Sequence, residues 1–239
     1  MLLSVAGRMP RHGFSCVLGK NTKMHESPWQ FLGIRHNAAY RRSYMYKRQL
    51  TFQKIICFFA LAACALAFIY ALGIMTDLYD SLYYTMMDPT DPDDTWVQGS
   101  QVYYHMQPFN RQLLNYSIVM ILFACLLFIT GTHSRRRYYI GNIVSTGVFA
   151  VSSVAYSVFS HINIEKYKAE FLKIDFEELE FFADLYDTPY IDSTFWFDAH
   201  YAVFGVLLLA AALLIVNMIA KFVFMRAERR LIEEGKKVL

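Results

Sequence analysis

The chain has 239 residues, of which 56% are hydrophobic and 17% are aromatic, and its charged fraction is only 18%. Soluble domains carry roughly 25% charged residues, so this composition indicates an integral membrane protein rather than a soluble domain. The net charge of +3 is small, and we expect no nucleic-acid partner. The cysteines Cys16, Cys57, Cys64 and Cys125 form no CxxC motif, and we place none on the outer face, so no disulfide framework is predicted.

Residues 1–54 form a basic segment with ten Lys or Arg and a single acid, Glu26. Glycine and proline interrupt it, and it contains no apolar run of the length found in a cleaved signal peptide. We predict a cytoplasmic, partly disordered N-terminal segment. Met24 and Met45 could each serve as an alternative start, which leaves open whether residues 1–44 belong to the mature protein. An organellar transit segment is the competing interpretation, because the stretch is Arg-rich and acid-poor.

Four apolar runs follow, at residues 55–75, 113–131, 140–162 and 201–225. A helix of about 20 apolar residues crosses a hydrocarbon core of about 30 Å. We therefore predict an all-α integral membrane protein with a four-helix transmembrane bundle over residues 55–225. The charged residue of the fourth run, Lys221, lies near its end, where a lysine can extend to the interface.

The charges outside these runs are segregated by segment. The outer loops 76–112 and 163–200 hold six and ten acids against one and three basic residues, whereas residues 132–139 hold three arginines and no acid. Lys and Arg in short flanking segments stay on the cytoplasmic side. The sequence thus predicts an N-in/C-in topology, with residues 226–239 as a cytoplasmic tail. Arg135, Arg136 and Arg137 form a cytoplasmic turn that could also contact anionic lipid headgroups.

The two outer loops differ in character. The first contains four aspartates in seven residues (Asp88, Asp91, Asp93 and Asp94) around two Asp-Pro steps; we favour a solvated turn over a cation site, because the spacing does not match a calcium-binding loop. The second has apolar residues at helical spacing with a phase shift near Asp175, which predicts an extracytoplasmic amphipathic helix. This helix either caps the bundle, lies on the membrane, or docks a partner through the aromatic residues Phe171, Phe182, Tyr190, Phe195 and Trp196.

The third run carries a stripe of polar residues at steps of four, with Phe149 filling the gap: Asn142, Thr146, Ser153, Ser157 and His161. Small and hydroxyl residues let helices approach closely in a membrane. The first run offers a ridge of small residues that could receive the stripe, at Ala60, Cys64, Ala67 and Ala71. We favour helix packing as its role, and a polar lining for a substrate path is the alternative.

The sequence offers few indications of a catalytic or ligand-binding site. The sequence contains no HExxH, GxSxG, Walker A or GxGxxG motif, and no charge at the middle of an apolar run. His161, His200 and Asp198 could approach each other at the outer interface, where hydrogen bonding is favoured over a metal or proton-handling site. We expect no cofactor, no metal and no catalytic residue.

Three functional hypotheses remain. The first is a non-catalytic accessory or scaffold subunit of a membrane complex, whose partners are the lipid bilayer and another membrane protein, such as a transporter, or a second copy. The alternative is a small oligomeric solute transporter or channel lined by the polar stripe. A membrane enzyme using Asp187, Asp192, Asp198 and His200 comes third. The preferred location is a plasma membrane, with the bacterial cytoplasmic membrane first, because of the basic cytoplasmic flanks.

Overall fold

A computed structural model describes residues 28–85, 87, 91, 94–132 and 138–237. These residues form five helices: α1 (Pro28–Tyr83), α2 (Val102–Thr132), α3 (Tyr138–Phe171), α4 (Phe176–Tyr186) and α5 (Phe195–Lys237). The chain divides into two units, Met1–Met45 and Tyr46–Leu239. The second unit contains the helical bundle, and the first contributes the beginning of α1.

Four of the helices are long and apolar enough to cross a membrane, over Gln49–Leu78, Val102–Gly131, Ile140–Phe171 and Phe195–Ala227. Each contains one of the four runs predicted from the sequence. These segments are 30 to 33 residues long, and at 1.5 Å per residue they reach about 45 Å or more. Because the hydrocarbon core is about 30 Å thick, part of each helix must extend beyond it.

The bundle is organised around α3, which packs against both α2 and α5. Small residues on α1 bring it close to the other helices, and all are at most 1% exposed: Ala60, Ala63, Cys64, Ala67 and Ala71. Aromatic rings fill the centre, where Phe204 lies edge-on to both Tyr70 and Tyr156. The Tyr156 hydroxyl donates to the Leu113 carbonyl across 3.0 Å. Close backbone approach and cross-helix hydrogen bonds are what hold helices together in lipid.

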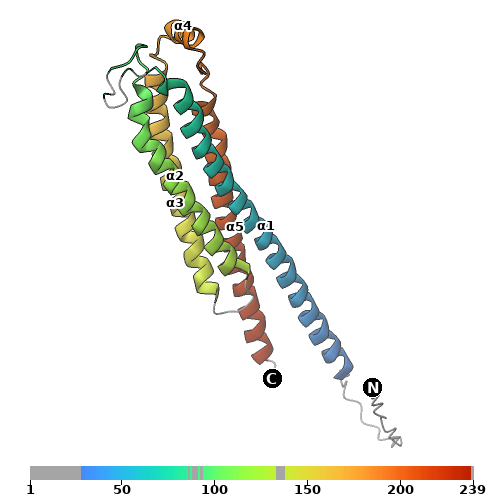
Figure 1. The fold of residues 1–239 in the computed structure, drawn as a ribbon. Coiled ribbons are helices and arrows are strands. Elements are labelled where there is room, and N and C mark those ends of the chain that lie inside the picture. The colour runs from blue at the N-terminus through green and yellow to red at the C-terminus, as the bar shows by residue number, and fades with distance from the viewer. Residues whose placement is uncertain (1–27, 86, 88–90, 92–93, 133–137, 238–239) are drawn as a thin grey trace, which may run out of the picture. The chain divides into compact units, whose positions relative to one another are not determined.

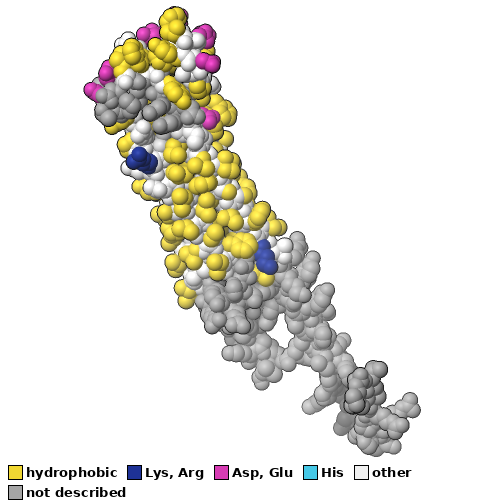
Figure 2. Space-filling model, in the orientation of Figure 1, with side chains coloured by type: hydrophobic (Ala, Val, Ile, Leu, Met, Phe, Trp, Pro, Cys, Tyr) yellow, Lys and Arg dark blue, Asp and Glu magenta, His cyan; other side chains and the backbone are white. Residues whose placement is uncertain are grey.

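The outer surface of the bundle is apolar along its length. On α3, for example, Val144, Val148, Val151, Val154 and Val158 are all exposed. In Figure 2 hydrophobic side chains cover the visible face of the described bundle, and carboxylates gather at the end that carries α4. A continuous exposed apolar surface of this kind suits a lipid environment.

The helices extend further into the predicted outer loops than the apolar runs indicate. Residues 102–112 continue α2 despite Pro108, because Val102, Met106 and Phe109 bury one helical face. Phe109 lies against Tyr167 of α3 with ring centroids 5.6 Å apart. The Tyr167 hydroxyl also donates to the His105 carbonyl at 3.0 Å. This packing explains why a segment that was predicted as loop is helical.

The short helix α4 lies between α3 and α5 in the chain. The break between α3 and α4 falls near Asp175, where the sequence predicted a shift in the helical spacing of apolar residues. Asp175 is the N-cap residue, and its carboxylate accepts a hydrogen bond from the Glu178 amide at 3.1 Å. Leu179 and Ala183 of α4 are buried. Figure 1 shows α4 at the end of the bundle where α3 finishes and α5 begins. In this chain α4 therefore caps the bundle.

The loop before α2 packs against the same turn. Gly99 has φ +93°, and a Cβ there would lie 3.0 Å from the Ile174 Cα. The Asp175 amide donates to the Gln98 carbonyl at 3.2 Å. Glycine is required at this position because both the backbone conformation and the close approach exclude a side chain.

Candidate functional site

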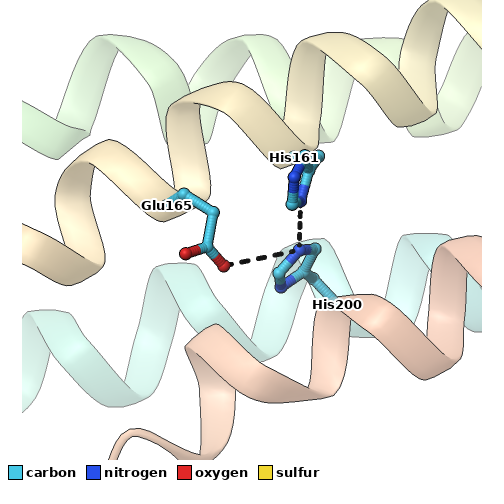
Figure 3. Close-up of side chains that lie close together, drawn as sticks. All are labelled: His161, Glu165 and His200. Carbon is cyan, nitrogen blue, oxygen red and sulfur yellow. Dashed lines mark hydrogen bonds and ion pairs between the residues drawn. The ribbon is translucent and has the colours of Figure 1, made fainter.

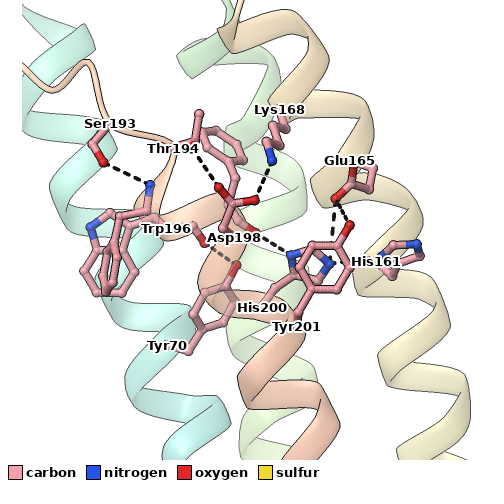
Figure 4. A network of polar contacts seen from close by, with 12 residues as sticks. Tyr70, His161, Glu165, Lys168, Ser193, Thr194, Trp196, Asp198, His200 and Tyr201 are labelled. Carbon is pink, nitrogen blue, oxygen red and sulfur yellow. Dashed lines mark hydrogen bonds and ion pairs between the residues drawn. The ribbon is translucent and has the colours of Figure 1, made fainter.

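The polar residues at the α4 end of the bundle form a network between α3 and α5 (Figure 4). His161, Glu165 and Lys168 share one face of α3, because they are separated by four and three residues. Asp198, His200 and Tyr201 face them from the start of α5. The network is thus positioned by two rigid helices, which is the best support for a defined geometry.

Two histidines form the centre of the network. His161 Nδ1 lies 3.0 Å from His200 Nε2, and the rings stack with centroids 5.3 Å apart. His200 is 1% exposed, whereas His161 is exposed. His200 Nδ1 contacts the Phe197 carbonyl oxygen, which can only accept a hydrogen bond. Neutral His200 therefore carries its proton on Nδ1, and its Nε2 presents a lone pair toward His161.

Glu165 is the third member of this group (Figure 3). One of its oxygens, Oε1, lies 3.9 Å from His200 Nε2. The same oxygen accepts a hydrogen bond from the Tyr201 hydroxyl at 2.8 Å. The donor atoms of His161, Glu165 and His200 all lie within 4.8 Å of one another. Two imidazole nitrogens and one carboxylate oxygen are therefore grouped within one small region between α3 and α5.

Asp198, which the sequence grouped with the two histidines, has other partners. The Lys168 ammonium contacts Oδ1, and the Thr194 hydroxyl donates to Oδ2 at 2.7 Å. Both carboxylate oxygens are thus engaged on the far side of the network. Glu165 takes the place expected for Asp198. Its position one helical turn from His161 was the available signal, because residues four apart on a helix lie side by side.

A second polar cluster lies near the other end of α3. The Lys221 ammonium donates to Asn142 Oδ1 at 2.7 Å, and the Gln53 amide approaches the same oxygen at 3.3 Å. That Lys221 extends to the membrane interface stays a prediction from the sequence; its described partner is Asn142. Its side chain turns to Asn142 because the amide supplies an acceptor inside the bundle, where an unpaired ammonium is costly.

The structure separates the members of the polar stripe. Asn142, Thr146, Ser153 and Ser157 are buried, whereas His161 is exposed. Ser153 donates to the Phe149 carbonyl within its own helix at 2.8 Å. Among the described residues, the hydroxyls of Ser157 and Ser160 are buried without a hydrogen-bond partner.

The five aromatic residues predicted to dock a partner also lie in different environments. Phe171 is fully buried against Phe176 and Phe197, so it belongs to the interior and offers no surface, contrary to the sequence prediction. Phe182 is half-buried, and its ring lies 4.6 Å from that of Tyr186. Tyr190 and Phe195 are exposed.

Trp196 is held against α1 rather than displayed. Its indole nitrogen donates to Asp77 Oδ2 at 2.7 Å, and its carbonyl accepts from the Tyr70 hydroxyl at 2.8 Å. A Cβ at Gly73 would lie only 2.0 Å from the indole ring. Gly73 thus provides the space for Trp196, and the pair fixes the start of α5 on α1.

The most exposed aromatic residue of α4 was not among the predicted docking residues. Phe181 is 70% exposed and Leu185 is 63% exposed, and they lie four residues apart on the face opposite Leu179 and Ala183. Arg135, Arg136 and Arg137 lie outside the described residues, as do Asp88 and Asp93 of the acidic turn.

The chain matches no protein-family model, and no curated protein or solved structure is significantly similar to it.

Proposed function

We propose that this protein is a non-catalytic accessory or scaffold subunit of a membrane complex, and that the outer face of α4 docks its partner. The observation that carries the proposal is the exposure of Phe181 and Leu185 on a helix whose opposite face is already buried on the bundle. Large apolar side chains that stay exposed together commonly mark an interaction surface.

The charges of α4 indicate what kind of surface would bind there. The helix carries four acids and no basic residue: Glu177, Glu178, Glu180 and Asp184. All four are exposed around Phe181 and Leu185. An apolar centre with an acidic rim suits a partner with an apolar pocket and a basic rim. The carboxylates also make this face unsuited to insertion into a membrane with anionic lipids.

The proposal places α4 on the extracytoplasmic side of a plasma membrane, with the bacterial cytoplasmic membrane preferred. It rests on the segregation of basic and acidic segments along the chain. The partner would then be a membrane protein, such as a transporter, that exposes a basic-rimmed pocket on its extracytoplasmic face.

The test is gentle-detergent purification of the tagged protein from its native membrane, followed by mass spectrometry. We expect a stoichiometric membrane partner with the wild-type chain, and its loss in the Phe181→Glu/Leu185→Glu double variant. Met87→Glu is the matched control, because Met87 is an exposed apolar residue of the first loop. Recovery of the wild type as a pure homo-oligomer, or equal partner loss in the control, would contradict the proposal.

A small oligomeric transporter or channel is the second candidate. It is favoured by the buried, unpartnered hydroxyls of Ser157 and Ser160 on α3, which a polar solute or water could satisfy. The Ser153→Leu/Ser157→Leu double variant distinguishes the two candidates. Loss of transport with intact assembly would support the path, whereas loss of assembly would support helix packing.

A further inference from the structure

A group of possible metal ligands lies at the α4 end of the bundle, formed by His161, Glu165 and His200. The proposed docking role of α4 does not require this group. The three donor atoms come from two helices and lie within 4.8 Å of one another (Figure 3). We propose that His161, Glu165 and His200 bind a divalent transition-metal ion of the Zn²⁺ type, which ties α3 to α5. This inference does not depend on the accessory role.

The three ligand atoms lie close enough together to reach one such ion when their side chains rotate. Zinc lies about 2.0–2.1 Å from histidine nitrogens and carboxylate oxygens, so tetrahedral ligand atoms are about 3.3 Å apart. The two histidine nitrogens are 3.0 Å apart, and the Glu165 oxygen is 3.9 Å from His200 Nε2. The first distance must widen slightly and the second must shorten slightly. The third distance, between His161 Nδ1 and the Glu165 carboxylate oxygen, is within 4.8 Å and must shorten by up to about 1.5 Å, which rotation of the Glu165 side chain can supply.

The proton arrangement also favours metal binding. Because the His200 Nδ1–H is directed to the Phe197 carbonyl, the lone pair of Nε2 is aimed at the site. A metal-bound histidine usually donates its other ring N–H to an acceptor of this kind. His161 Nδ1 must supply the proton in the contact with His200 Nε2. A cation would replace that proton at Nδ1, and His161 would then carry its single ring proton on Nε2, as a neutral metal-bound histidine does.

Glu165 has an outer partner as well. The Tyr201 hydroxyl donates to Oε1 at 2.8 Å and so orients the carboxylate toward the histidines. Hydrogen bonds to the ligands commonly raise metal affinity by 10- to 100-fold. The site thus includes both the ligands and the groups that hold them in place.

The ligand types select the class of ion. Two imidazoles and one carboxylate suit Zn²⁺ and its transition-metal neighbours, whereas Mg²⁺ and Ca²⁺ prefer oxygen ligands alone. Three protein ligands leave the fourth position for water or an exogenous group. His161 is exposed and provides a route of entry. The neighbouring Lys168 ammonium is paired with Asp198, which limits its repulsion of a cation.

The experiment uses the full-length protein in detergent, carrying an affinity tag without histidine and stripped of metal with a chelator. Titration with Zn²⁺ by calorimetry should show one equivalent bound, and Mg²⁺ should not compete. Co²⁺ should bind at the same site and give the visible absorption of a four-coordinate ion. A merely structural role for the three residues would produce no such absorption.

The variants provide the decisive comparison. His161→Gln and Glu165→Gln should each weaken Zn²⁺ binding by about 100-fold or more, and Tyr201→Phe by about 10-fold. His105→Gln is the matched control, because His105 also lies near a glutamate, Glu170, at 3.9 Å, but without a second histidine. It should leave binding unchanged. Absence of stoichiometric Zn²⁺ binding in the folded wild type, or an unchanged affinity in His161→Gln, would overturn the proposal.

Discussion

Two polar clusters join helices of this bundle at opposite ends of α3, and their chemistry differs. At one end Lys221 and Gln53 both donate to Asn142, so a single amide oxygen receives two hydrogen bonds. At the other end two histidine nitrogens and a glutamate oxygen lie within 4.8 Å of one another, and His161 is exposed on the surface of the bundle. The first cluster is satisfied by its own members. The second presents more acceptors than donors, which is the condition for binding a cation.

The comparison shows that a polar residue near the end of a transmembrane helix has no fixed meaning. Asn142 and His161 belong to the same stripe in the sequence, yet Asn142 joins helices by hydrogen bonds alone, whereas His161 belongs to the group proposed to bind a metal ion. The difference lies in the partners that the other helices supply. Asn142 faces two hydrogen-bond donors, Gln53 of α1 and Lys221 of α5, whereas His161 faces an acceptor nitrogen of His200 on α5.

The largest expected effect comes from breaking the contact that holds the start of α5, next to His200. Gly73→Val would place its Cβ inside the volume of the Trp196 ring. We expect a loss of about 3 kcal/mol in the free energy of unfolding, because overpacking forces the ring and the helix apart. Reversible unfolding in detergent or bicelles measures it. Gly205→Val is the control, since nothing lies within 4 Å of a Cβ there. Equal losses in both variants would show that Trp196 does not fix α5.

The next largest effect comes from the Lys221 end. Asn142→Leu removes the acceptor of Lys221 and leaves an ammonium and the Gln53 amide without it. The expected loss in stability is about 2 kcal/mol, because hydrogen bonds to charged groups are strong and a buried unpaired donor is costly. Asn115→Leu, at an exposed position of α2, should have little effect. Adding Lys221→Met to Asn142→Leu should recover part of the loss, and a double variant less stable than Asn142→Leu would argue against the pairing.

The smallest effect on stability is expected for the ion pair beside His161, Glu165 and His200. Lys168 and Asp198 contact each other at the surface, where water and salt screen the attraction. Lys168→Met should change the stability less than Asn142→Leu does, and the difference from wild type should shrink as salt is raised. Unfolding at low and high ionic strength measures this. A loss of stability in Lys168→Met that is as large as in Asn142→Leu and independent of salt would contradict this difference between the two ends of α3.

The sequence predicted the four long helices because apolar runs of this length have few alternatives. It also predicted the break near Asp175, where the helical phase shifts and an N-cap residue stands. It missed residues 102–112 of α2, whose helix depends on burying Phe109 against Tyr167, a contact between segments far apart in the chain. The topology across the membrane stays a prediction from the charge pattern.

The candidate site was less accessible to sequence reasoning. The pairing of His161 with His200 was anticipated, but Glu165 was not, and Asp198 was placed in its stead. Lys168 and Thr194 contact the carboxylate of Asp198, which leaves Glu165 as the carboxylate beside the histidines. The sequence does not indicate which of the two carboxylates these residues contact. Phe181 was missed for a similar reason. Its exposure follows from the rotation of α4 on the bundle, and helical spacing alone does not fix that rotation.

The most direct test of the proposed function is crosslinking in the native membrane. A photoreactive phenylalanine analogue would replace Phe181 on α4 and, as a control, Val216 on the exposed apolar surface of α5. The account predicts one discrete protein adduct from position 181, lost when Leu185 is also changed to glutamate, and no protein adduct from position 216. Position 181 giving no protein adduct in intact membranes, while the protein is folded and abundant, would contradict α4 as a docking face.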